Sequence, residues 1–96
     1  MAKFQVVSVA KLKEMLEQRN LWSKMRSGKL RVVEQATALA KISPGGISYI
    51  VSYYDKQSRN FFTIHRIVTN RGDTIHEHVK DACIDGVRYK AKIGIK

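Results

Sequence analysis

The sequence contains one cysteine, one proline and no long apolar segment. Because Cys83 has no second cysteine to pair with, an internal disulfide and a cysteine-based zinc site are both excluded. The longest apolar run, residues 47–54, is interrupted by two serines and is too short to span a bilayer. The apolar residues near the N-terminus are broken by polar ones, which makes a poor signal peptide. We therefore expect a cytoplasmic protein with no membrane partner.

Acidic residues are also scarce, and this shortage sets the charge. Eight Asp and Glu residues stand against 18 Lys and Arg, which gives a formal net charge of +10. The hydrophobic fraction of 44% is ordinary for a chain that folds around a core, so extensive disorder is not expected. A strongly basic folded domain indicates a polyanionic partner, and nucleic acid is the first candidate.

The first half of the chain has the pattern of helices. Residues 4–7 suit a short strand, and Ser8 can cap a helix that begins at Val9 and stops at Asn20. Alanine-rich residues 30–42 predict a second helix, with apolar residues at helical spacing. The Ser-Pro-Gly-Gly segment that follows would end it, because proline cannot continue a helix.

The second half changes to the two-residue period of strands. Four runs alternate in polarity and are separated by segments with turn chemistry: residues 47–54, 61–69, 74–83 and 87–95. Short links favour an antiparallel meander. The sequence thus predicts one α+β domain over residues 1–96, with a helical half (1–42) whose two helices pack on one face of a four-stranded antiparallel meander sheet (47–95). A winged helix-turn-helix, with residues 61–79 as the wing, is the alternative.

Strand register assigns each side chain to a face of this sheet. With Tyr54 opposite Phe61, and Thr69 opposite Thr74, one face collects apolar residues: Ile47, Tyr49, Val51, Tyr53, Phe62, Ile64, Val68, Ile75 and Val79. This core face also receives an opposite-charge pair, Arg66 and Glu77.

The last turn leaves two registers open. A two-residue Asp-Gly hairpin would place Ile84 opposite Val87 and turn His76 and His78 to the apolar side. A three-residue loop places Cys83 opposite Val87 instead and keeps the core face apolar. We favour the three-residue loop, which makes Cys83 a core residue.

The opposite face carries the groups that suit nucleic-acid recognition. Aromatic rings can stack on bases, and cations can contact phosphates. On this face we assign stacking to Tyr54 and Phe61, phosphate contacts to Lys80, Arg88, Lys90 and Lys92, and hydrogen bonding to His65, His76 and His78. A second basic cluster lies between the predicted helices and consists of Arg19, Lys24, Arg26, Lys29 and Arg31. RNA or single-stranded nucleic acid is the favoured partner.

The histidine cluster also allows a catalytic interpretation. His65, His76 and His78 could act as acid and base in a metal-independent endoribonuclease, because imidazole titrates in the useful pH range. In the order of its predicted elements the chain resembles RelE-type and colicin-type ribonuclease toxins, which implies a small basic α+β fold with a sheet-borne active site. The cationic setting of Lys80, Lys90 and Lys92 opposes a metal ion, so we predict no metal and no cofactor.

A third interpretation needs neither catalysis nor nucleic acid. A small basic inhibitor or assembly protein could dock the same face on an acidic protein surface. Oligomeric state is not predicted by any feature of the sequence.

Overall fold

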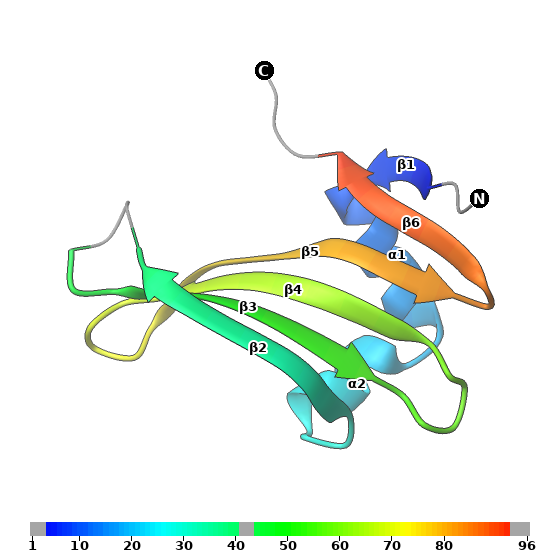
Figure 1. Cartoon of the computed structure of the whole chain (residues 1–96), viewed down its shortest axis with the longest axis horizontal. Helices are drawn as coiled ribbons and strands as arrows, with labels where there is room; N and C mark the ends of the chain where they lie inside the picture. The colour runs from blue at the N-terminus through cyan, green and yellow to red at the C-terminus, as the bar shows by residue number, and fades with distance from the viewer. Residues whose placement is uncertain (1–3, 41–43, 93–96) are drawn as a thin grey trace.

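The protein folds into a six-stranded sheet with two helices on one of its faces (Figure 1). The computed structural model describes residues 4–40 and 44–92. In chain order the elements are β1 (Phe4–Ser8), α1 (Val9–Gln18), α2 (Leu21–Arg26), β2 (Arg31–Leu39), β3 (Ile47–Tyr54), β4 (Phe61–Val68), β5 (Thr74–Ile84) and β6 (Val87–Lys92). The strand order is β1-β6-β5-β4-β3-β2, with β1 parallel to β6 and the other neighbours antiparallel. The predicted α+β class is confirmed.

The predicted four-stranded meander is the centre of a larger sheet. Strands β3 to β6 lie at the predicted positions and pair in sequence order. The sheet has six strands because β1 adds to the β6 edge and β2 adds to the β3 edge. The predicted last strand extended through residues 93–95, which lie outside the described residues.

The predicted second helix, residues 30–42, is wrong. Residues 31–39 form β2, an edge strand in which every residue is exposed. Because both faces of this strand are exposed, its sequence does not alternate in polarity, and the spacing of its alanines matched that of a helix. Pairing with β3 decides the conformation, and Val32, Val33 and Thr37 suit it because β-branched residues favour strands. Residues 31–39 therefore do not belong to a helical half of the chain. The winged-helix alternative also lacks the helix that it requires at these residues.

Helix α1 begins and ends close to the predicted residues, whereas α2 was not predicted. Ser8 accepts a hydrogen bond from the Lys11 amide at 3.0 Å and caps α1. Asn20, with φ of 59°, adopts the left-handed conformation between α1 and α2. No helix in the described part of the chain is long and apolar enough to cross a membrane.

The core lies between the helices and the β4–β6 part of the sheet. Leucines from α1 and α2 pack against apolar residues of the sheet, and α1 lies over β5, β6 and β1. The largest fully buried side chains are Phe62, Leu12, Leu16, Leu21, Ile64, Ile84 and Val79. In the view of Figure 1 the helices lie behind the sheet, so the other face, here named the outer face, points to the viewer.

The predicted register holds across the middle of the sheet. Tyr54 pairs with Phe61, and His65 pairs with His78. Glu77 pairs with Arg66 on the helix side, where their side chains bond at 2.6 Å. Near the β4–β5 turn a register shift pairs Thr74 with Val68 in place of Thr69, and leaves Ile75, predicted to face the core, 51% exposed.

The prediction for the last turn is wrong, and a bulge explains why. Ile84 pairs with Val87 across a two-residue Asp85-Gly86 turn, in which both residues have positive φ, as a tight hairpin turn requires. The register of β5 shifts by one residue at Lys80, since Val79 pairs with Ile64 and Asp81 with Thr63. This bulge lets the histidines and the apolar end of β5 face opposite sides.

The shifted register also moves Cys83. It pairs with Phe61 and Arg88 on the outer face and is half-buried, whereas Ala82 and Ile84 are buried in the core. The sequence did not locate this bulge, because a longer loop and a bulge both restore the same alternation of faces.

Candidate functional site

One row of residues crosses the whole outer face at one end of the strands. Each member pairs directly with the next on the neighbouring strand, and the row runs from β1 to β2 as Phe4, Arg88, Cys83, Phe61, Tyr54 and Arg31. Neighbouring strands lie about 4.8 Å apart, so the row spans about 24 Å. It places three aromatic rings and two arginines along one line, and is named here the aromatic–arginine row. Four of its six members were predicted site residues.

The β1 end of the row contains a small pocket. Its lining includes Phe4, Phe61, Cys83 and Arg88, and its volume is about 120 Å³. Phe4 is 51% exposed although it is a large apolar side chain. An exposed phenylalanine beside an arginine offers a flat apolar surface and a cation to the same ligand.

The β2 end of the row opens into a basic hollow. Tyr54 lines it together with Lys29, Arg31, Lys56 and Lys24, and its volume is about 750 Å³. Asp55, which also lines it, already bonds Lys24. The structure thus brings Tyr54 together with three members of the predicted second cluster, Lys24, Lys29 and Arg31.

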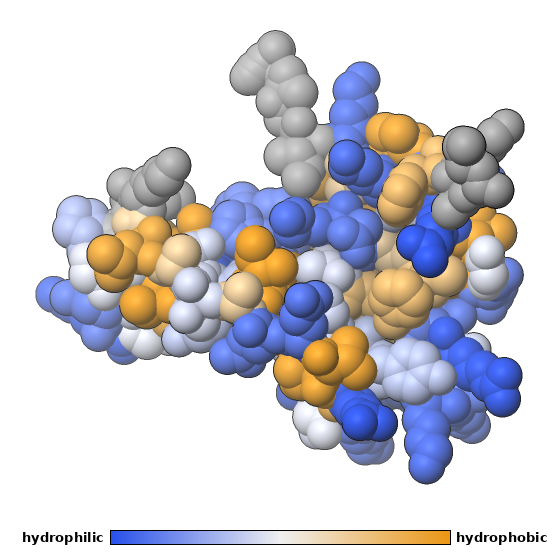
Figure 2. All heavy atoms as spheres, viewed as in Figure 1, coloured by the Kyte–Doolittle hydropathy of each residue, from blue (hydrophilic) through white to orange (hydrophobic). Residues whose placement is uncertain are grey.

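Of the four cations predicted to contact phosphates, Arg88 belongs to the row, and Lys80, Lys90 and Lys92 lie farther along β5 and β6. Arg88, Lys90 and Lys92 are exposed and Lys80 is half-buried in the bulge. Within residues 4–40 and 44–92 none of the four forms an ion pair. Asp81 is the acidic residue nearest in register, since it pairs with Lys90 across the two strands. Figure 2 shows this outer face, where hydrophilic residues predominate and hydrophobic ones form separate patches.

The predicted cluster between the helices is divided by the fold. Arg19 bonds Asp85 at 3.1 Å, Lys24 bonds Asp55 at 3.3 Å, and Arg26 bonds Glu77. All three carboxylates belong to the sheet or its turns, so these ion pairs hold the helices to the sheet. Three of the five cations of the predicted second cluster are therefore paired with carboxylates of the protein itself.

Trp22 serves the core in this arrangement. It is half-buried and packs against the hydrophobic cluster. The Lys13 ammonium lies 4.9 Å from its ring centroid, and the Arg26 guanidinium carbon lies 5.5 Å away. Its ring is therefore already covered by two cations.

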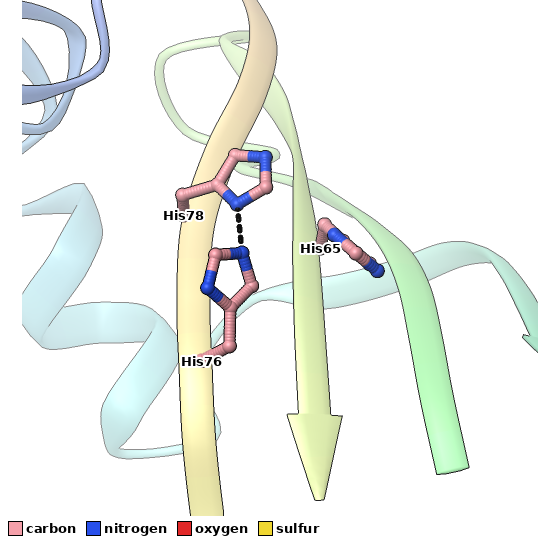
Figure 3. A group of neighbouring side chains, drawn as sticks. All are labelled: His65, His76 and His78. Atoms are coloured by element: carbon pink, nitrogen blue, oxygen red, sulfur yellow. Dashed lines mark hydrogen bonds between the residues drawn. The ribbon is translucent and has the colours of Figure 1, made fainter. Parts of the chain in front are cut away.

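All three histidines gather on the outer face, as the register predicted (Figure 3). His76 Nε2 lies 2.7 Å from His78 Nδ1, and the His65 ring centroid lies 5.2 Å from that of His78. His65 Nε2 also lies 2.7 Å from the Ser48 hydroxyl on β3. The sequence placed Ser48 on this face but did not predict its contact with His65.

The surroundings favour the neutral form of two of these imidazoles. Burial lowers the pKa of His65, and the positive charges of His76 and Lys80 lower it further. Burial also lowers the pKa of His78, with His76, His65 and Lys80 adding to the effect. At neutral pH His65 and His78 therefore carry free lone pairs and can accept hydrogen bonds or bind a metal ion.

No family model, curated protein or solved structure matches the chain. Phe4 is the aromatic member of the row that sequence reasoning missed. The predicted strand at residues 4–7 gave the signal, but its parallel pairing with β6 was not visible in a local pattern.

Proposed function

We propose that the protein binds single-stranded nucleic acid, RNA or DNA, on the outer face of its sheet. The aromatic–arginine row is the observation that supports this proposal most strongly. Phe4, Phe61 and Tyr54 are spaced along one line that crosses the strands, with Arg88 and Arg31 in the same line.

The chemistry of the row suits unpaired bases. A base stacked on an aromatic side chain contributes about 1–3 kcal/mol, and this contact needs an exposed base face. In a duplex the base faces are covered by their neighbours, so single strands are preferred. Arg88 and Arg31 supply cations within the row. Lys90 and Lys92 continue the positive surface along β6, where they can contact the phosphates of the bound strand.

The distribution of ion pairs supports the outer face over the helix side. On the helix side Arg26 and Arg66 share Glu77 as counter-charge. On the outer face, among the residues that the structure describes, Arg88 and Lys92 have no such partner. Cations without a carboxylate partner thus lie on the same face as the aromatic–arginine row.

Fluorescence anisotropy with labelled RNA, single-stranded DNA and duplex DNA of equal length tests the proposal. We expect the single strands to bind more tightly than the duplex, and the Arg31→Gln/Arg88→Gln variant to bind both single strands at least tenfold more weakly. Lys11→Gln/Lys13→Gln is the matched control, since it removes the same charge from the exposed side of α1. Equal losses in the two variants would show that only bulk charge matters and would contradict the proposal.

Two further variants separate stacking from charge. Phe4→Leu keeps an apolar side chain and removes the ring, so we expect affinity to fall by about 1–3 kcal/mol with no loss of stability, because Phe4 is half exposed. Asp81→Asn removes the negative charge opposite Lys90 and should tighten binding. If none of the three nucleic acids binds, the proposal fails and docking on an acidic protein surface becomes the better interpretation.

A further inference from the structure

The histidine cluster brings three potential metal ligands within reach of one another. His65 on β4, and His76 and His78 on β5, each offer one ring nitrogen, and these nitrogens all lie within 4.8 Å of one another. The chain has no other histidine. Figure 3 shows the rings of His76 and His78 facing each other along β5, with His65 beside them on the adjacent strand.

These distances are close to those of a coordinated ion. Two nitrogens bound about 2.1 Å from one tetrahedral zinc ion lie about 3.4 Å apart. His76 Nε2 and His78 Nδ1 are 2.7 Å apart, so an ion between them needs the rings to separate slightly. His76 is exposed and can turn, while the paired backbones of β4 and β5 hold His65 and His78 opposite each other.

One ligand already has a partner of the kind that supports metal sites. Histidines that bind metals usually engage their second ring nitrogen in a hydrogen bond, which sets the orientation of the ring. Ser48 Oγ occupies that position for His65, 2.7 Å from Nε2. In Figure 3 the ring of His65 extends away from the other two, which leaves its Nδ1 nearer to them.

The two ring nitrogens of His78 have different surroundings. His78 Nε2 is buried and has no hydrogen-bond partner among the described residues. Its Nδ1 faces His76 Nε2 and is the nitrogen that an ion between these two rings would bind, because one imidazole presents only one nitrogen to a given ion.

We propose that His65, His76 and His78 bind a divalent transition-metal ion of the kind that prefers imidazole, with Zn²⁺ as the reference ion. The sequence argued against a metal because of three nearby lysines. In the structure Lys90 lies opposite Asp81 and not opposite a histidine, and Lys80 is the lysine whose charge reaches the cluster. Three protein ligands leave at least one coordination position open.

Titration of the untagged protein with Zn²⁺ alone, against a chromophoric chelator, tests this site. We expect one Zn²⁺ per chain and at least a tenfold loss of affinity in His76→Gln, a change at an exposed position that should leave the fold intact. Cys83→Ser is the control, because it removes the single thiol and should leave binding unchanged. Circular dichroism of each variant without metal verifies that it is folded.

Two more measurements make the assignment specific. Ser48→Ala should weaken Zn²⁺ binding by roughly 10–100-fold, because it removes the hydrogen bond that orients His65. Co²⁺ in place of Zn²⁺ should give visible absorption bands that His76→Gln abolishes. If the wild type binds no Zn²⁺, or if the folded His76→Gln variant binds it as tightly, the site does not exist.

This site is independent of the proposed nucleic-acid interface. The ligands lie on β4 and β5 away from the aromatic–arginine row, and nucleic-acid affinity can be measured with a chelator present. Failure of Zn²⁺ binding therefore leaves the proposed function untouched, and the reverse also holds.

Discussion

Glu77 joins the helices to the sheet, and its removal gives the sharpest test of how this protein balances its charge. Its side chain is 10% exposed and binds two arginines, Arg66 from β4 and Arg26 from α2. The Arg66 Nε lies 2.6 Å from one carboxylate oxygen, and Arg26 contacts the other. Both guanidinium groups therefore depend on one carboxylate on the helix side of the sheet.

Glu77→Gln preserves the size of this side chain and removes its charge. Breaking a fully buried pair costs about 3–5 kcal/mol, because the remaining charge is left without a partner. Here Arg66 keeps 22% of its side-chain exposure and Arg26 keeps 54%, so water compensates in part. We expect a loss of about 2–3 kcal/mol, which corresponds to a melting temperature lower by about 8–24 °C for a domain of this size.

Urea denaturation and thermal melting, both followed by circular dichroism, measure this loss. Arg66→Gln and the Arg66→Gln/Glu77→Gln double variant complete a thermodynamic cycle that isolates the coupling between the two charges. We expect the double variant to be no less stable than Glu77→Gln, because Arg66, the more buried of the two stranded cations, is gone. A loss below about 0.5 kcal/mol for Glu77→Gln, typical of a surface pair, would refute the reasoning.

Four other predictions use different features of the structure. Lys90→Gln/Lys92→Gln should reduce the slope of log affinity against log salt for single-stranded DNA by about 1.4, at about 0.7 per lost phosphate contact, and an unchanged slope would place these lysines outside the interface. Asp55→Asn should cost about 1.5–3 kcal/mol at neutral pH, because Asp55 accepts hydrogen bonds from the Ser58 hydroxyl and the Lys24 ammonium. The Ser58 bond outweighs burial and lowers the Asp55 pKa in the folded state, so this difference should fade as pH drops below about 4 in urea titrations at several pH values. Gly86→Ala should cost about 1–2 kcal/mol in the same assay, since φ is 82° but a Cβ there meets no atom within 4 Å, and a neutral result would contradict the strain argument. RNA incubated with the protein and EDTA should remain intact on a denaturing gel, because the unpaired Nε2 of His78 is buried. Cleavage without a metal would support the ribonuclease alternative.

The sequence by itself determined the central meander and much of its outer face. Alternation of polar and apolar residues located β3 to β6, and turn chemistry between them set the pairing of Tyr54 with Phe61 and of His65 with His78. These features follow from local rules, since side chains alternate along a strand and short turns join neighbouring strands. The histidine cluster and the pairing of Tyr54 with Phe61 were therefore predictable.

Only the tertiary structure decided which strands form the edges of the sheet and which cations are paired with carboxylates. Residues 31–39 form a strand because they pair with the edge of β3. Phe4 belongs to the aromatic–arginine row because β1 pairs with β6, which lies more than 80 residues away in the chain. The bulge at Lys80 reversed the side assigned to Cys83, and the sheet carboxylates neutralised Arg26 and its neighbours. Each of these depends on contacts between distant segments, which no local pattern encodes. The scarcity of acidic residues set the net charge, but the fold chose which cations remain exposed.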